Sequence, residues 1–364
     1  MSPTSQRDAN SANVVTWMDI MSGQRRGVVA SACRVGLSVL SSGYAAVTGV
    51  RNLAFDHGWR ESTRVAAKVI SVGNLTAGGT GKTPTVAWVV RTLQELGASP
   101  AIISRGYGGQ GGVNDEKLVL DQLVPGVPHL LNPKRVLAAQ ELMNRPEAER
   151  PRTLVLDDAF QHRQIARDFD LILIDCLNPW GFGHLLPRGL LREPLRSLSR
   201  ASCVLMTRCD QVDEEVRQTI LSTIRRWTTV PILMSSFQPT RLINSRGEVR
   251  PIETLRQEHV AAFCGIGNPM GFRRTLTSCG VSIPDVHFRV YPDHHAYQTE
   301  DLHEIGDWAR SMQVECLVST QKDLVKIPRT TLNDIPLWAV EISLKFDDPE
   351  SESQLVEMLK AVVR

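Results

Sequence analysis

SVGNLTAGGTGKTP, residues 71–84, is the stretch that decides the fold of this chain. It is close to the pattern G-x-x-x-x-G-K-[ST], in which a glycine-rich turn binds nucleotide phosphates. Gly81, Lys82 and Thr83 match the second half of the pattern, whereas Thr76 stands where the first glycine is expected. Glycines let backbone N–H groups converge on phosphate oxygens, and the following helix adds the positive end of its dipole. A glycine-rich turn with a surface lysine is the alternative, but a loop between a strand and a helix favours the nucleotide site.

The residues on both sides of this loop predict a strand, a helix and a second strand. KVISVGN (68–74) is rich in β-branched residues, 83–97 has helical periodicity, and 99–106 is a short apolar run. A strand–helix–strand unit implies a parallel sheet. Further apolar runs indicate buried strands at 153–158, 171–176, 203–208 and 231–236, with an amphipathic helix at 214–227. We therefore expect an α/β fold built on a P-loop NTPase-like, mostly parallel sheet.

The character of the chain changes near residue 241. The segment 241–258 is polar, contains an SRGE turn and resembles a short hairpin linker. Strand and helix patterns then resume, which predicts a second, smaller α/β domain. The expected segments are an N-terminal segment (1–50), a P-loop core domain (51–240), the linker (241–258) and a C-terminal α/β domain (259–364).

Composition excludes several classes of protein. Lys and Arg number 41 against 39 Asp and Glu, so the net charge of +2 gives no support for a nucleic-acid partner. The seven cysteines are scattered and never form C-x-x-C. A zinc site or a disulfide framework is therefore not expected, and a reducing compartment is the natural environment.

The N-terminal segment is apolar but not strongly so. From residue 27 to 50 it is mostly small and apolar, interrupted by Arg34 and flanked by Arg25, Arg26 and Arg51. Its hydrophobicity is weak for a spanning helix, which needs about 20 strongly apolar residues. Two interpretations remain open from these residues: an amphipathic helix packed on the domain, or a helix that lies in a membrane interface with its arginines at anionic headgroups.

Two other stretches carry acidic residues at the ends of expected strands. LVLDDAFQH (154–162) is an apolar run that ends in Asp157 and Asp158, the pattern of a Walker B element that holds Mg²⁺. SRGYGG (104–109), followed by Asp115 and Glu116 in VNDE, lies where the active face of an open sheet is expected. These two acids suit a base and a metal ligand, although an exposed charge pair is the commoner explanation of such a pair alone.

Two motifs from later in the chain have both functional and structural explanations. YPDHHAY (291–297) places histidines beside an aspartate, which is typical of a general base or of a turn. LLPRGLLREP (185–194) suits a phosphate-binding or a lipid-facing loop. TRCD (207–210) has Arg where a base-reading element needs Lys, so we give it little weight.

Taken together and in this order, VGNLTAGGTGKTP, SRGYGG, LDDAFQH, LLPRGLLREP, FCGIGNP, YPDHH and STQKDLVK resemble the tetraacyldisaccharide 4′-kinases, the lipid A 4′-kinase family. The similarity runs from about residue 16 to residue 346 and includes SGYAAVTGVRNLAFDHGWR (42–60). The resemblance implies transfer of the ATP γ-phosphate to the 4′-hydroxyl of a tetraacylated glucosamine disaccharide 1-phosphate. It also implies a membrane-associated N-terminal helix, work at the cytoplasmic face of the bacterial inner membrane, and no obligate protein partner.

The resemblance also assigns roles to residues. Asp115 is the implied general base, His294 pairs with it, and Lys82 stabilises the migrating phosphoryl group. The implied ATP-binding residues are Thr76, Ala77, Gly78, Gly79, Thr80, Gly81, Lys82, Thr83 and Arg135, and the implied Mg²⁺ ligands are Thr83, Glu116, Asp157 and Asp158. His162 and Glu193 are expected to support the site.

Three positions depart from the family pattern: Asn114, Arg188 and Gln321. Arg188 puts local substrate contacts in doubt, and none of the three touches the phosphate loop or the aspartate pair. Two other functions stay open from the residues. One is a cytosolic P-loop kinase or ligase that acts on a soluble small molecule, and the other is a nucleotide-dependent switch with no acceptor chemistry.

Overall fold

The computed structural model describes residues 18–106 and 115–364, so the polar segment 1–15 and most of the SRGYGG–VNDE stretch lie outside the described residues. Its helices are α2 (Val28–Asp56), α3 (Lys82–Glu95), α4 (Asp115–Leu123), α5 (Arg135–Met143), α6 (Glu214–Arg225), α7 (Pro269–Ser278), α8 (Thr299–Ser311), α9 (Gln321–Leu324) and α10 (Pro349–Val363). Its strands are β1 (Lys68–Asn74), β2 (Pro100–Ser104), β3 (His129–Leu131), β4 (Thr153–Asp157), β5 (Phe169–Asp175), β6 (Cys203–Thr207), β7 (Ile232–Ile243), β8 (Val249–Pro251), β9 (Val260–Cys264), β10 (Phe288–Val290), β11 (Cys316–Thr320), β12 (Thr331–Leu332) and β13 (Ile335–Phe346).

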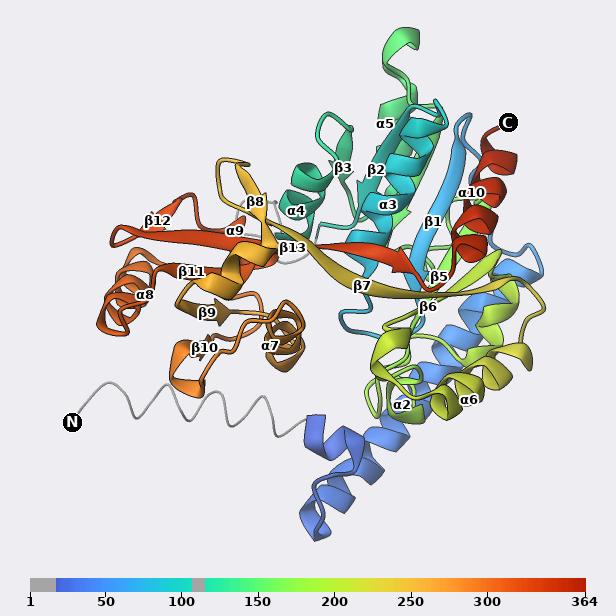
Figure 1. Cartoon of the computed structure of the whole chain (residues 1–364). Helices are drawn as coiled ribbons and strands as arrows, with labels where there is room; N and C mark the ends of the chain where they lie inside the picture. Colours follow the sequence, from blue (N-terminus) through green and yellow to red (C-terminus); the bar gives the residue numbers. More distant parts are fainter. Residues whose placement is uncertain (1–17, 107–114) are drawn as a thin grey trace.

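These strands form one sheet with the order β10-β9-β11-β13-β7-β6-β5-β1-β4-β2-β3 (Figure 1). From β7 to β3 every neighbouring pair is parallel, and so are the pairs among β10, β9, β11 and β13. The single antiparallel junction on this path joins β7 to β13. The expected α/β fold with a mostly parallel sheet and a second, smaller α/β part is confirmed.

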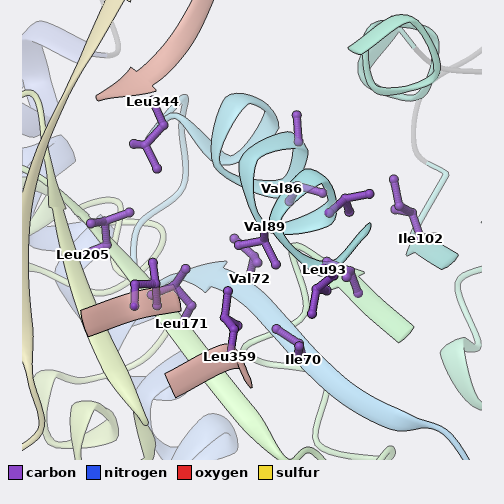
Figure 2. Close-up of a cluster of buried hydrophobic side chains, with 14 of the residues drawn as sticks. Ile70, Val72, Val86, Val89, Leu93, Ile102, Leu171, Leu205, Leu344 and Leu359 are labelled. Carbon is purple, nitrogen blue, oxygen red and sulfur yellow. The ribbon is translucent and has the colours of Figure 1, made fainter. Parts of the chain in front are cut away.

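Strands β1–β6 belong to the first lobe and strands β8–β12 to the second, smaller lobe. The core of the first lobe surrounds α3. Val86, Val89 and Leu93 of this helix are fully buried against apolar residues of the parallel strands, such as Ile70 and Leu171 (Figure 2). Parallel strands are buried on both faces, which is why their sequences are almost continuously apolar. The helix that follows the phosphate loop is therefore held rigidly on the sheet.

The two lobes do not follow the domain boundaries that the sequence predicts. The expected boundary at residue 240 falls inside β7, whose first part pairs with β6 and whose second part pairs with β13. The last helix, α10, packs on the first lobe although it lies in the expected C-terminal domain: Leu355 and Leu359 are fully buried in the core around α3, together with Leu344 of β13. The chain returns to the first lobe along β13 because the long β7–β13 ribbon runs through both.

Because α10 packs on the first lobe, we expect this helix to stabilise that lobe. Leu359→Ala should lower the free energy of unfolding by about 2–5 kcal/mol, because the leucine is fully buried and its removal leaves a cavity. Chemical denaturation of the two proteins measures the difference. Val362→Ala, at a partly buried position on the same helix, should cost less, and equal losses for the two variants would contradict the assignment of Leu359 to this core.

Helix α2 turns polar side chains inward and apolar side chains outward. The Ser41 hydroxyl donates to the Leu185 carbonyl at 2.9 Å, and the Tyr44 hydroxyl donates to the Arg192 carbonyl at 3.0 Å. On the other face, seven large apolar residues are 63–87% exposed: Val28, Val29, Val35, Val39, Leu40, Val47 and Val50. The N-terminal part of the helix extends beyond the rest of the molecule (Figure 1). By length and composition α2 is the one helix in residues 18–106 and 115–364 able to cross a membrane, which alone is weak support for such a role.

Candidate functional site

The phosphate loop turns sharply at its last glycine. Gly81 is the N-cap of α3 and has φ +87°, in the left-handed region that favours glycine. A Cβ at this position would lie 1.9 Å from the Phe237 ring of β7. Glycine is therefore required at residue 81 by both the backbone and the packing, and the turn places Lys82 and Thr83 in the first turn of α3.

Thr76 does not take part in this sharp turn. It is 5% exposed and pairs as an antiparallel bridge with Leu191, and its φ is not positive. The neighbouring Ala77 amide donates to the Leu190 carbonyl at 2.7 Å. Extended backbone tolerates any side chain, which explains how a threonine replaces the first glycine of the usual pattern.

The other loop residues are braced from the strand ends beside them. The Asn74 amide group donates to the Thr80 hydroxyl at 2.9 Å, and the Thr207 hydroxyl donates to the Thr80 carbonyl at 3.1 Å. The Arg208 guanidinium donates to the Gly79 carbonyl at 2.9 Å and forms an ion pair with Asp175. TRCD, given little weight as a base-reading element, thus holds the phosphate loop in place.

Asp158 is neutralised by two cations at the end of β4. Its carboxylate accepts from Arg192 at 2.8 and 2.9 Å and lies 3.6 Å from the Lys82 ammonium. Burial alone would raise the pKa of Asp158, but the positive charges of Lys82 and Arg192 outweigh it and hold the pKa below its ordinary value. The aspartate has φ +48°, a conformation that non-glycine residues rarely adopt and that is concentrated at functional sites. Arg192 comes from LLPRGLLREP, so this segment contacts the phosphate side of the site.

Asp157 lies in a different environment. It is 6% exposed, and burial together with the negative charges of Asp158 and Glu116 raises its pKa to about 6. A divalent cation would relieve this excess negative charge. Among residues 18–106 and 115–364 there is no group of three His, Cys, Asp or Glu able to hold a metal by itself. Mg²⁺ commonly takes only one or two protein carboxylates and completes its shell with phosphates and water, so Asp157 fits it as a ligand, and the Thr83 hydroxyl stays a predicted second ligand.

Arg135 occupies an unexpected position for a phosphate ligand. It is 1% exposed, and its guanidinium donates to the main-chain carbonyl of Asp157 at 3.2 Å and to that of Asp158 at 3.5 Å. In this arrangement the arginine supports the turn that carries the two aspartates. The neighbouring His162 has its pKa lowered to about 4 by burial and by nearby arginines, the first of them Arg135.

The acceptor-side pair comes from both lobes. Asp115 begins α4 in the first lobe, and its Oδ2 lies 2.9 Å from Nδ1 of His294 in the second. His294 has φ +58° and so lies in the left-handed region, as Asp158 and Arg208 do. Asn114 and the glycines at 108, 109, 111 and 112 lie outside the described residues. The structure therefore places the two residues together, and their catalytic roles stay predictions.

Two lysines near these carboxylates escaped the sequence interpretation. Lys322 Nζ lies 3.1 Å from Glu116, and this carboxylate raises the pKa of the lysine against the opposing effect of burial. Lys326 Nζ lies 3.9 Å from Asp115 and 3.2 Å from the fully buried Asp323. Both lysines belong to STQKDLVK, which carried the resemblance but had no assigned role. The spacing of four residues between the two lysines was the feature of the sequence that could have pointed to them.

The pKa of Asp157 predicts how divalent cation binding depends on pH. Because the pKa rises from 3.8 to about 6 on folding, the folded protein holds a proton here between about pH 4 and 6. This proton opposes a cation, so Mg²⁺-dependent ATP binding should weaken as the pH falls below about 6. Without a cation, the same shift lowers folding stability as the pH rises through this window, by about 3 kcal/mol at most.

Calorimetric titration of ATP with and without Mg²⁺ at pH 5 and pH 7 measures this dependence. Asp157→Asn is the control, because it removes the titrating carboxylate and should leave only the pH dependence of ATP itself, whose terminal phosphate also titrates at about pH 6. An equal pH dependence of the Mg²⁺ effect in Asp157→Asn and in the unsubstituted protein would contradict the assignment of Asp157.

Comparison with known proteins identifies the family of this chain. Residues 33–360 match the family model described as Tetraacyldisaccharide-1-P 4′-kinase (LpxK). The chain is 37% identical to a tetraacyldisaccharide 4′-kinase of Syntrophus aciditrophicus over 89% of this chain and 92% of that protein. It is 38% identical to one of Elusimicrobium minutum, over 86% and 87% respectively. A crystal structure described as the "apo" form of LpxK from Aquifex aeolicus in complex with ATP superposes with a TM-score of 0.71 at 25% identity, covering 91% of this chain and all of that one. The chain belongs to the tetraacyldisaccharide-1-P 4′-kinase family.

Proposed function

We propose that this protein transfers the γ-phosphate of ATP to the 4′-hydroxyl of a tetraacylated glucosamine disaccharide 1-phosphate, a step of lipid A biosynthesis. The observation that carries the proposal is the meeting of two half-sites. Lys82 and the aspartate pair belong to the first lobe, and Asp115 is paired with His294 of the second lobe at 2.9 Å. Family membership supplies the substrate class.

The phosphate half-site would bind and neutralise the triphosphate. Lys82 and the amino end of α3 face the place where phosphate oxygens gather in P-loop proteins. Asp157, Thr83 and Glu116 would hold Mg²⁺, which would draw charge from the β- and γ-phosphates. Arg192 and Lys82 keep Asp158 ionised beside them. Stabilisation of charge in the transition state is the main task of such a site.

The acceptor half-site would orient the sugar hydroxyl. A sugar hydroxyl has a pKa far above 7, so a carboxylate mainly positions it and takes its proton late in the transfer. Asp115 is 9% exposed at its side chain and is bracketed by His294 and Lys326. His294 Nδ1 at Oδ2 and the Glu116 amide at Oδ1 fix the direction of the carboxylate, and Oδ1 keeps a second lone pair to accept the proton.

The substrate's acyl chains place the reaction at a membrane, and α2 is suited to dock there. Its outward face is apolar, which is the reverse of a helix packed on a soluble domain. We propose that α2 holds the protein at the cytoplasmic face of the bacterial inner membrane. The inward face of the helix connects this membrane contact to the site, because Arg51 donates to the fully buried Glu193 at 2.5 Å, next to Arg192.

Product analysis tests the catalytic proposal. The protein is incubated with Mg²⁺, ATP and the disaccharide 1-phosphate lipid in mixed micelles, and ³¹P NMR and mass spectrometry identify the product. The expected product carries a second phosphate monoester at the 4′-position. Phosphorylation of soluble glucosamine derivatives in preference to the lipid would instead support a cytosolic P-loop kinase for a soluble small molecule.

Vesicle flotation tests the membrane proposal. Val35 and Val39 are exposed on the same face of α2, so the double substitution V35E/V39E should weaken binding to anionic phospholipid vesicles about tenfold or more, since it removes the burial of two apolar side chains. Val249→Glu, at a 51% exposed valine on β8, is the control and should leave vesicle binding unchanged. Equal flotation of the double variant and the unsubstituted protein would contradict docking through this face.

A further inference from the structure

A buried chain of polar side chains runs from the surface to the carboxylate assigned to the cation. We propose that Asp121, His129 and Ser104 form a positioning chain that holds Asp157 and ties it to α4, the helix that begins with Asp115. None of the three belongs to the residues discussed above for catalysis or binding. The inference rests on the proposed function, in which Asp157 lies at the Mg²⁺ position.

Each link of the chain is a hydrogen bond of 2.9–3.1 Å. The Ser104 hydroxyl donates to Asp157 Oδ2 at 3.1 Å. Ser104 Oγ lies 2.9 Å from His129 Nε2, and His129 Nδ1 lies 2.9 Å from Asp121 Oδ1. Because the single hydroxyl proton goes to Asp157, both imidazole nitrogens must donate, so His129 joins the serine to Asp121 in its doubly protonated form. Asp121 favours this form, whereas burial lowers the pKa of His129 and opposes it.

The four residues come from neighbouring elements. Asp157 and Ser104 end the adjacent parallel strands β4 and β2, and His129 begins β3 at the edge of the sheet. Asp121 lies in α4, six residues after Asp115. The positioning chain therefore joins β4, which carries Asp157, to α4, which carries Asp115.

The order Asp–His–Ser is that of a hydrolase triad, but its burial excludes that use. Ser104 is 4% exposed and the His129 side chain is 1% exposed, so no substrate reaches the serine hydroxyl. Asp121 alone lies near solvent, at 38% side-chain exposure, where Lys117 also pairs with it at 2.5 Å. A hydroxyl that is buried against a carboxylate fixes the direction of that carboxylate.

The hydrogen bond from Ser104 matters because the two neighbouring aspartates are held differently. Lys82 and Arg192 hold the Asp158 carboxylate. Among the described residues, the Ser104 hydroxyl is the donor that holds the Asp157 carboxylate. Groups that orient metal-ligating carboxylates commonly contribute 10–100-fold to metal affinity or activity. Loss of the Ser104 hydroxyl should therefore weaken Mg²⁺ binding and leave the KM for the lipid unchanged.

The test uses the full-length protein and measures Mg²⁺ directly. Calorimetric titration of Mg²⁺ into protein with saturating ATP should give an apparent Kd about tenfold higher for Ser104→Ala than for the unsubstituted protein. KM for the lipid should stay unchanged. Ser319→Ala is the matched control, because Ser319 is also buried at the end of a strand but donates only to the Phe263 carbonyl in the second lobe.

Substitution of His129, the middle residue of the positioning chain, gives a second test. His129→Phe keeps a ring of similar size but removes both nitrogens, and it should weaken Mg²⁺ binding in the same direction. If the residues act as one chain, the double variant S104A/H129F should be no weaker than the more affected single variant, since coupled positions are not additive. Additive losses would show that the two residues act independently and would overturn the proposal.

Other outcomes are equally decisive. If Ser104→Ala does not fold, Asp121→Asn at the exposed end of the chain should still raise the Mg²⁺ Kd. Unchanged Mg²⁺ affinity in both Ser104→Ala and Asp121→Asn would overturn the chain. Failure of the proposed function is distinguishable, because it would appear as absent phosphate transfer to the lipid in the unsubstituted protein, whatever its Mg²⁺ affinity.

Discussion

Replacing Asp115 with asparagine is expected to lower kcat for phosphate transfer by about 10²–10⁴-fold, the range found when a general base is removed. The side chain keeps its size and stays beside His294, but it can no longer accept the proton of the sugar hydroxyl. Affinity for ATP should change little, because Asp115 belongs to the acceptor half-site, where its partners His294 and Lys326 come from the second lobe.

The measurement is steady-state transfer to the lipid with kcat and KM determined separately, together with calorimetric ATP binding. Asp285→Asn is the control, because Asp285 is 89% exposed in the second lobe and, among the residues that the structure describes, its ion-pair partner is Arg273. A loss confined to ATP binding, with kcat intact, would remove Asp115 from the role of base. His294→Gln should produce a smaller loss of kcat, since it removes the support of the base and not the base itself.

Replacing Lys82 with methionine is expected to lower kcat/KM by at least about 10²-fold, as for the loss of one preorganised group that stabilises transition-state charge. The ammonium lies 3.6 Å from Asp158 and is 12% exposed, so the lysine is already held in place before nucleotide binds. Methionine keeps the length of the side chain and removes only the charge. Asp158 retains Arg192, which limits the structural damage.

Lys82→Arg separates charge from geometry. A bulkier guanidinium keeps the positive charge but not the compact ammonium, so most of the activity should still be lost. Thermal unfolding without nucleotide should show that both variants are folded. Full activity of Lys82→Met would mean that the loop between β1 and α3 does not bind the transferred phosphate.

Local sequence patterns predicted the elements around the phosphate loop well. The β-branched run 68–74, the loop and the following helix correspond to β1, the turn at Gly81 and α3, because each depends on residues close together in the chain. The pairing of Asp115 with His294, by contrast, came from the resemblance and not from spacing, since 179 residues separate them.

Features made by distant contacts could not be predicted. Lys326 reaches Asp115 only because the second lobe folds against α4, and Ser104 meets His129 only through the order of β2 and β3 in the sheet. The packing of α10 on the first lobe depends on the path of β13, which no pattern within residues 349–363 reveals. The outward apolar face of α2 is likewise visible only once its inward polar partners are known.

The ratio of phosphate transferred to ATP consumed is the most direct test of the proposed lipid phosphorylation. With γ-labelled ATP, Mg²⁺ and the disaccharide 1-phosphate lipid in mixed micelles, both quantities are measured in the same reaction, with and without lipid. The proposed transfer predicts one phosphate on the lipid for each ATP consumed, and almost no ATP consumption when lipid is omitted. ATP consumption that does not depend on lipid, or none at all, would contradict it and would leave a nucleotide-dependent switch as the better explanation of the phosphate loop.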